Sequence, residues 1–317
     1  MSNRPILTVV GPTASGKTSL AVALARRVDG EIIGLDSRQI YRGMAIGTAQ
    51  PTPEERGGIP HHLIGFRDPR EPVSAGEFAK RVRQAVGEIR KRQRAPLICG
   101  GAGLYYRAVT RGIFAGSVAD LTIRARLDRE FDQQGGEALL KRLTSIDPDY
   151  AAITHPNNRK RLVRALEIAE ATGKPPSEHF RDQKKQGAAT LDCFTVFLDW
   201  PLDQLEDRIR QRTNQMLQAG WIEEARRLFD QYGQQAIHPL DSIGYRQIRD
   251  YLEDKLSDTE LVEEIVLRTR QYAKRQRQWF RHEKVDLKIN PAEFESAEAM
   301  ADEILSRYFQ GVHSAVE

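Results

Sequence analysis

The residues best suited to chemistry form one segment near the amino terminus that fits Gly-x-x-x-x-Gly-Lys-Ser/Thr in full. It consists of Gly11, Pro12, Thr13, Ala14, Ser15, Gly16, Lys17 and Thr18. In this motif, the P-loop, the glycines let the backbone curl around an anion, and the following helix adds partial positive charge. Lys17 supplies a full charge, and the Thr18 hydroxyl is placed to bind Mg²⁺. The segment predicts a diphosphate or triphosphate site, but names neither ATP nor a reaction.

A second group of polar residues begins at Asp36, where the second apolar run of the sequence ends. In an open α/β sheet, ligands bind at the carboxyl ends of the strands. A carboxylate there holds Mg²⁺, accepts a proton from an acceptor group, or caps a turn, and the residues alone leave these roles open. The polar and aromatic residues that continue to Tyr41 predict a second substrate beside the phosphate.

Short apolar runs alternate with longer amphipathic runs, which predicts a parallel sheet covered by helices on both faces. Strands are expected at 6–10, 31–35, 96–100 and 193–198, and helices at 18–28, 76–94, 103–109, 201–219, 222–232 and 258–280. Three glycines after the third strand, Gly100, Gly101 and Gly103, serve either the close approach of another group to the backbone or simple helix–strand packing. Both interpretations stay open.

Between about residues 117 and 186 the pattern indicates helices alone, expected at 121–133, 136–145 and 159–172. The expected fold class is α/β, with a P-loop NTPase-like parallel sheet core and a helical insertion domain. Residues 1–116 and 190–317 are assigned to the core with its C-terminal helices. Residues 117–189 are assigned to the insertion.

Composition sets broad limits on the function. The 317 residues are 40% hydrophobic, enough for a large and a smaller domain. No apolar run approaches the roughly 18 residues of a membrane span, so a cytoplasmic protein without a membrane partner is expected. Cys99 and Cys193 lie in strand-like runs and indicate neither a disulfide nor a zinc site.

The positive charge gathers in two places, although 48 Lys and Arg against 44 Asp and Glu leave a net charge of only +4. One cluster lies at 159–164, and the other lies at 268–284, where Tyr272, Trp279 and Phe280 interleave with the cations. Each cluster is either a solvated helix face or a surface for a nucleic-acid backbone.

Segments in order along nearly the whole chain resemble the tRNA dimethylallyltransferases, also called tRNA isopentenyltransferases. They are the P-loop, 36–44, 46–51, 61–63, 67–69, 244–247 and 269–276. The resemblance implies transfer of a dimethylallyl group from dimethylallyl diphosphate to N6 of the adenosine 3′-adjacent to the anticodon, in tRNAs reading codons that start with U. Pyrophosphate would leave with Mg²⁺ assisting, so the P-loop would hold a leaving group, although such proteins are often described as ATP-binding. A monomer is expected.

The resemblance also implies roles position by position. Thr13 through Thr18 would contact the diphosphate, Asp36 would be the general base, and Thr13, Lys17 and Arg212 would complete the catalytic set. Contacts with tRNA are implied for Asp36, Ser37, Arg38, Gln39, Ala102, Arg124, Lys160, Arg161, Leu162, Val163, Arg164, Asp241, Ser242, Ile243, Gly244, Tyr245 and Arg246. Ala102 stands where the family usually has threonine, and the residues just before Gly244 also depart from the family pattern.

Three other functions are consistent with parts of the sequence. A small-molecule P-loop kinase shares the phosphate motif but needs neither the basic clusters nor the helical insertion. A prenyltransferase acting on free adenine nucleotides shares the chemistry without the tRNA. A nucleic-acid-binding protein that uses its P-loop as a nucleotide switch would form no product.

Overall fold

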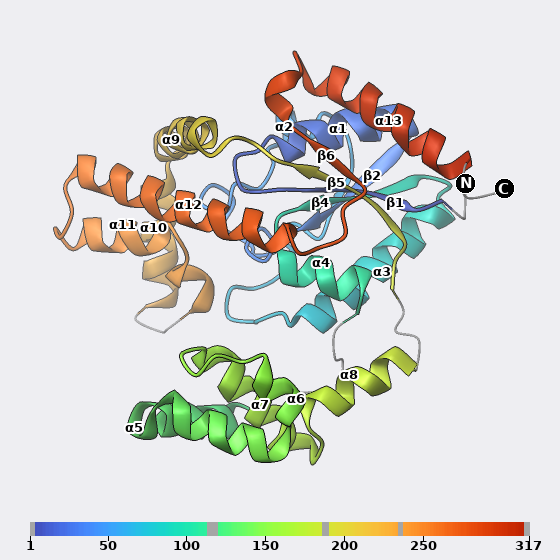
Figure 1. The fold of residues 1–317 in the computed structure, drawn as a ribbon. Helices are drawn as coiled ribbons and strands as arrows, with labels where there is room; N and C mark the ends of the chain where they lie inside the picture. The colour runs from blue at the N-terminus through green and yellow to red at the C-terminus, as the bar shows by residue number, and fades with distance from the viewer. Residues whose placement is uncertain (1–3, 113–119, 186–189, 234–236, 314–317) are drawn as a thin grey trace. The chain divides into compact units, whose positions relative to one another are not determined.

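The computed structural model describes residues 4–112, 120–185, 190–233 and 237–313. Its contacts divide the chain into two compact units. Unit 1 is Met1–Thr110 with Leu191–Glu317, and unit 2 is Arg111–Thr190 (Figure 1).

Unit 1 is built on a sheet of six parallel strands in the order β3-β2-β4-β1-β5-β6 (Figure 1). The strands are β1 Ile6–Val10, β2 Gly30–Leu35, β3 His61–His62, β4 Ala95–Gly100, β5 Cys193–Leu198 and β6 Leu287–Ile289. Every residue of β1 is buried, as expected for the centre of a sheet covered on both faces. The predicted α/β class with a parallel sheet is confirmed, and the sheet gains two short edge strands that the sequence pattern did not indicate.

Helices cover both faces of this sheet (Figure 1). On one face, α1 (Lys17–Val28) and α13 (Ala297–His313) share an apolar cluster that includes Leu20 and Ile304. On the other face lie α3 (Ala75–Lys91) and α4 (Gly103–Thr110). Within the described part of the chain, no helix is both long and apolar enough to cross a bilayer.

Most of the remaining helices of unit 1 stand beside the end of the sheet from which the P-loop emerges (Figure 1). They include α9 (Leu202–Gln218) and α12 (Asp258–Phe280), which pack together through an apolar cluster. A capping box at Ser257 begins α12, and its bounds match the prediction. The others in this group are α10 (Trp221–Tyr232) and α11 (Tyr245–Leu252), whereas α2 (Pro53–Arg56) lies against α1.

Unit 2 contains α5 (Leu121–Ile146), α6 (Pro148–Ala152), α7 (Arg159–Thr172) and α8 (Pro176–Lys185). Its core lies between α5 and α7 and includes Leu127, Leu143 and Leu166. Gly135, with φ 77° and ψ 171°, interrupts α5. The break separates the two helices that the sequence predicts on either side of it.

Glu31, the second residue of β2, is a buried carboxylate held by a histidine and an arginine. His62 Nε2 and Arg92 Nη2 lie 2.6 and 2.7 Å from its Oε2. Hydrogen bonding from Arg92 lowers the pKa of Glu31 below its ordinary value of 4.5. A carboxylate with a lowered pKa stabilises the fold above its ordinary pKa, and the contribution is lost as the pH falls through the lower folded value.

Glu31→Gln should therefore reduce the free energy of unfolding by about 2 kcal/mol at neutral pH, the usual worth of a charged hydrogen bond. The loss should shrink in acid, where the wild-type carboxyl also becomes protonated. Urea denaturation at several pH values measures both. A loss that stayed constant across this range would contradict the ionic role.

Candidate active site

The P-loop joins β1 to α1 at the centre of the sheet. Gly16 precedes α1 in a left-handed conformation, φ 84°, and the N–H groups of the first helical turn need acceptors from outside the helix. The Ala14 carbonyl accepts from Arg208 Nε at 2.8 Å, and the Ser15 carbonyl accepts from Trp200 Nε1 at 2.9 Å. Trp200 and Arg208, which follow β5 in the chain, therefore hold the P-loop in its conformation.

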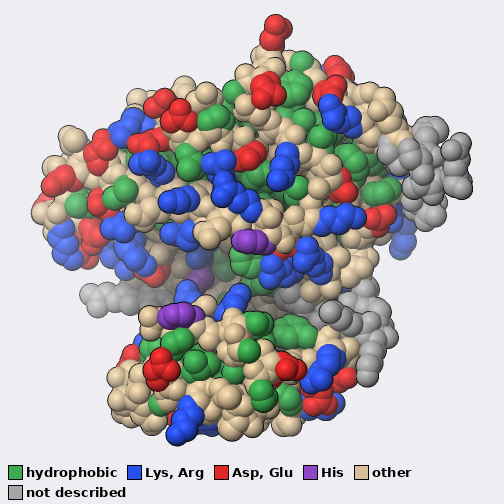
Figure 2. All heavy atoms as spheres, in the orientation of Figure 1, with side chains coloured by type: hydrophobic (Ala, Val, Ile, Leu, Met, Phe, Trp, Pro, Cys, Tyr) green, Lys and Arg blue, Asp and Glu red, His purple; other side chains and the backbone are tan. Residues whose placement is uncertain are grey.

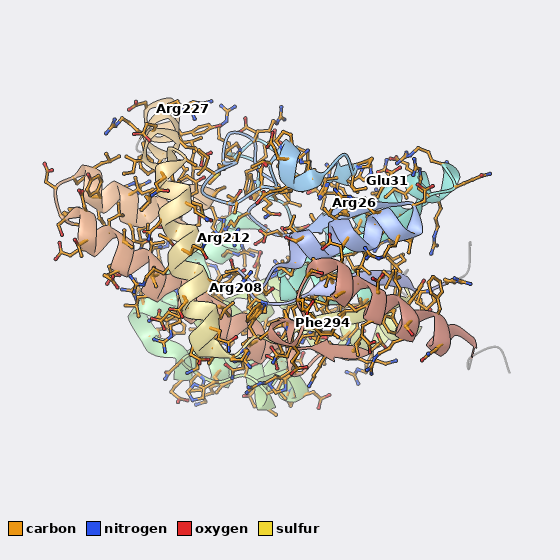
Figure 3. The ribbon with its side chains drawn as sticks, turned by 90° about the horizontal axis from the view of Figure 1, so that it is seen from above. Arg26, Glu31, Arg208, Arg212, Arg227 and Phe294 are labelled. Carbon is orange, nitrogen blue, oxygen red and sulfur yellow. The ribbon has the colours of Figure 1, made fainter. Side chains whose placement is uncertain are left out.

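Two cations face the loop from different elements. Lys17 Nζ donates to Pro12 O at 2.5 Å, and Arg212 Nη1 donates to Thr13 Oγ1 at 3.0 Å. Figure 3 shows Arg208 and Arg212 on the side of α9 that faces α1. Burial lowers the pKa of Lys17 to about 8 and also lowers the pKa of Arg212. Because burial disfavours their charged forms, both cations gain from a bound anion.

The pKa of Lys17 predicts that pyrophosphate binds more weakly as the pH rises from 7 to 9. The amine is protonated below about pH 8 and neutral above it, so the affinity should fall by about tenfold over this range. Titration calorimetry measures the profile. Lys17→Arg is the control, because arginine stays charged and its profile records only the ionisation of pyrophosphate. Superimposable profiles for the two proteins would contradict the prediction.

Asp36 follows β2 and lines the same pocket as Thr13 and Arg212. Its Oδ1 accepts from the backbone N–H groups of Arg38 and Gln39, at 2.7 and 3.2 Å. Its Oδ2 has no hydrogen bond with any residue that the structure describes. Asp36 therefore caps a turn with one oxygen and leaves the other for a ligand.

The pocket beside Asp36 has a volume of about 360 Å³. Thr13, Asp36 and Arg212 are among its polar residues. Apolar side chains from α9, α10, α12 and the segment before α11 form much of its remaining wall, namely Ile209, Met216, Trp221, Ile243 and Ile265. An anion site and an apolar space thus share one pocket, which the sequence alone did not locate.

A buried carboxylate braces one wall of this pocket. Glu224 accepts from the N–H groups of Ile46 and Gly47, both at 2.8 Å, and from the hydroxyl of Tyr245 at 2.7 Å. The ring of Trp221 packs so closely that a Cβ on Gly47 would lie 2.0 Å from its Nε1. The wall is therefore rigid and leaves no room for a larger side chain at Gly47.

Several predicted tRNA-contacting residues of unit 1 lie at the pocket. Ser37, Arg38, Asp241, Ser242 and Ile243 line it together with Asp36. The Arg38 guanidinium lies 2.9 Å from His238 Nδ1. Asp241 pairs with the exposed Arg246 at 2.7 Å. The structure brings these residues together, and their contact with tRNA stays a prediction.

The other predicted positions of unit 1 are turned inward. The Gln39 side chain donates to Ala49 O at 2.7 Å, and Tyr245 is fully buried. Ala102 is 8% exposed, and its N–H donates to Leu35 O. Gly244 packs against Trp221 with φ 91°. Because Tyr245 is fully buried in this conformation, its contact with tRNA stays a prediction.

In unit 2, buried Glu167 holds two of the predicted tRNA-contacting arginines. Arg124 and Arg164 each lie 2.8 Å from its carboxylate. Leu162 and Val163 lie in the core of this unit, 0% and 4% exposed. Packing in unit 2 removes these two apolar side chains from the surface, and their contact with tRNA stays a prediction.

Lys160 and Arg161 remain exposed at the start of α7 and form no ion pair with any described residue. Their neighbour Arg159 differs, because it pairs with Asp128 and Asp132 at 2.7 and 2.5 Å. The predicted cluster at 159–164 therefore divides into partnered arginines and two available cations.

The cluster on α12 divides similarly. Arg268, Arg270 and Arg277 pair with Glu264, Glu206 and Asp199. The cations that are exposed and form no ion pair with described residues are Lys274, Arg275, Arg281 and Lys284. Figure 2 shows Lys and Arg side chains spread over the visible face of unit 1.

Sequence reasoning missed Arg208, Trp200, Glu224 and Gln276, all of which contact the P-loop or the pocket wall. Arg208 had a usable signal, because it lies four residues before Arg212 and therefore on the same helix face. Glu224 had none, since its partner lies 177 residues away. Gln276 lies in the segment 269–276 that resembles the family, but its contact with Thr13, 263 residues away, could not be foreseen.

The fold and the site define a P-loop α/β protein whose anion site opens into a largely apolar pocket. Residues 39–283 match the family model described as IPP transferase. The tRNA dimethylallyltransferase of Syntrophobacter fumaroxidans is 42% identical over 277 residues, covering 87% of this chain and 81% of the relative. That of Geobacillus kaustophilus is 42% identical over 279 residues, covering 88% of each.

Solved structures agree. The tRNA isopentenylpyrophosphate transferase of Bacillus halodurans has a TM-score of 0.69 and 34% identity, covering 99% of this chain and 100% of that one. A eukaryotic dimethylallyltransferase acting on tRNA has a TM-score of 0.73 and 29% identity, covering 88% of this chain and 70% of that one. The chain belongs to the IPP transferase family, which confirms the resemblance seen in its motifs.

Proposed function

We propose that this chain transfers the dimethylallyl group of dimethylallyl diphosphate to N6 of the adenosine 3′-adjacent to the anticodon, in tRNAs reading codons that start with U. The products are N6-(dimethylallyl)adenosine and pyrophosphate. The observation that carries the proposal is the single pocket in which the P-loop, Arg212 and the free oxygen of Asp36 meet an apolar wall. Membership of a family whose curated relatives are named tRNA dimethylallyltransferase supports it.

The donor's diphosphate fits the anion site. Lys17, Arg212 and the first-turn N–H groups of α1 present positive charge where the bond between C1 and the bridging oxygen breaks. The electron pair leaves with pyrophosphate, and these groups stabilise the charge that develops. The apolar tail fits the wall that includes Ile209 and Met216, which keeps water from the reacting carbon.

Magnesium fits this site through the donor rather than through a protein cage. Among the described residues, no group of three or more His, Cys, Asp or Glu side chains could hold a metal ion. Mg²⁺ is commonly bound by a few protein oxygens together with substrate phosphates. The Thr18 hydroxyl would be its protein ligand here, and the ion would add positive charge beside the leaving group.

The acceptor amine needs a base, because the N6 lone pair is delocalised into the adenine ring. As the bond from N6 to C1 forms, the free oxygen of Asp36 takes the N6 proton. An adenine in the anticodon loop must leave its stack to reach the pocket. The exposed cations of α12, including Lys274 and Arg275, are suited to hold the RNA backbone. We further propose that the protein acts as a monomer in the cytoplasm.

The test is an assay with labelled dimethylallyl diphosphate and unmodified tRNA, followed by nucleoside analysis. The expected result is label on the adenosine next to the anticodon. Label on free AMP instead would favour a nucleotide prenyltransferase, and phosphate transfer from ATP to a small acceptor would favour a kinase. Nucleic-acid binding that ADP exchange abolishes, with no product formed, would favour a nucleotide switch.

A further inference from the structure

Three segments far apart in the sequence meet at the side chain of Gln276, on α12. Its Oε1 accepts from the N–H of Thr13 in the P-loop at 2.8 Å. Its Nε2 donates to the carbonyl of Gly101, in the loop after β4, at 2.9 Å. The residue is 6% exposed. Turning the amide over would place two donors together and two acceptors together, so these partners fix its orientation.

The loop after β4 is shaped to receive this amide. A Cβ on Gly101 would lie 2.4 Å from Gln276 Nε2 and 2.9 Å from Gly11 O. Trp279 lies three residues after Gln276 on the same helix, and a Cβ on Gly103 would lie 2.3 Å from its ring. The glycines therefore allow α12 to approach the backbone closely, which is one of the two roles that the sequence left open for them.

The helix face that carries Gln276 also forms one wall of the pocket. Ile265, Thr269 and Tyr272 line the pocket, and with Gln276 they follow the spacing i, i+4, i+7, i+11 of a single helix face. The Gln276 amide is therefore a hydrogen-bonded link between the wall that α12 supplies and the loop that binds the anion.

The same amide determines how Thr13 is used. Because the Thr13 N–H is bonded to Gln276, it does not point at the anion, and the Thr13 hydroxyl meets Arg212 at 3.0 Å. Without the amide, the partly buried N–H of Thr13 and the buried carbonyl of Gly101 would each lose a partner, and the P-loop would have to rearrange to satisfy them.

We propose that Gln276 is a positioning residue for group transfer, which fixes the register between α12 and the P-loop. It acts through Thr13 and Arg212 on the anion site and through its helix on the apolar wall. The claim that Gln276 positions a group-transfer reaction rests on the proposed function. The claim that Gln276 positions the anion site is independent of the proposed function.

The test uses the full-length chain with pyrophosphate as the probe. Gln276→Met keeps the approximate size of the side chain and removes both hydrogen bonds. Gly101→Ala disturbs the same contact from the other side and leaves the amide itself unchanged, although its Cβ would also approach Gly11 O at 2.9 Å. Gln278→Met is the matched control, because Gln278 is an exposed glutamine on the same helix. Each protein is measured for pyrophosphate affinity, tRNA affinity, single-turnover transfer rate and melting temperature.

We expect Gln276→Met and Gly101→Ala each to weaken pyrophosphate binding about tenfold and to slow single-turnover transfer at saturating donor, with unchanged tRNA affinity. The Gln278→Met protein should match the wild type. A lower melting temperature with wild-type pyrophosphate affinity and transfer rate would show a merely structural role and overturn the proposal. Failure of both variants to fold would overturn it in the same way.

The two proposals fail separately. If the wild type does not prenylate tRNA, the proposed function fails. If pyrophosphate affinity still separates Gln276→Met from Gln278→Met in that case, the positioning of the anion site by Gln276 stands.

Discussion

Replacement of Asp36 by asparagine should slow prenyl transfer by about 10²–10⁴-fold, the usual contribution of a positioned general base. Asparagine has nearly the same shape but cannot take the N6 proton. Binding of tRNA and of dimethylallyl diphosphate should be retained, because the P-loop and its cations are unchanged. Single-turnover rates measured with excess enzyme give the chemical step directly.

The two oxygens of Asp36 make a control possible. Oδ1 caps the turn through Arg38 and Gln39, and an asparagine Oδ1 can accept the same two hydrogen bonds. Asp36→Ala loses both the cap and the base. If the asparagine protein stays nearly as active as the wild type while the alanine protein loses activity, Asp36 acts as a cap and the general base lies elsewhere.

The elements predicted best from sequence are those with a strong local pattern. The four inner strands are apolar, and α12 combines a capping box with clear periodicity, so its bounds were predicted correctly. The edge strands β3 and β6 lack such a signal, because two or three residues that include His61, His62 and Lys288 do not look like a strand. Only their pairing with β2 and β5 defines them.

The candidate site shows the same division. The P-loop could be predicted because all its residues are contiguous, whereas the apolar wall collects single residues from several elements. The sequence also could not show which cations of a charge cluster form ion pairs and which do not. Arg159 and Arg164 stand beside Lys160 and Arg161, but their acidic partners include Asp128 on another helix and Glu167 buried beneath them. Which cations are available to RNA is decided by tertiary packing.

Reversing the two available charges at the start of α7, with Lys160→Glu and Arg161→Glu together, should weaken tRNA binding about 100-fold at low salt. Each cation that contacts a phosphate releases counterions, so the salt dependence of binding should also become shallower by about one to two units of log–log slope. Pyrophosphate affinity should not change, because Lys17 and Arg212 lie in unit 1. Filter binding at several salt concentrations measures the effect.

Local stability cannot explain such a loss. Residues 160 and 161 occupy the first turn of α7, where the helix dipole favours acidic side chains, and the wild type has none there. Two glutamates should therefore stabilise the helix slightly, so that a loss of affinity reports on lost phosphate contacts. Lys141→Glu is the control, since Lys141 is exposed on α5 beside Arg142, which pairs with Glu170 near the opposite end of α7. Equal tRNA affinity in the double variant and the control would remove α7 from the RNA-binding surface.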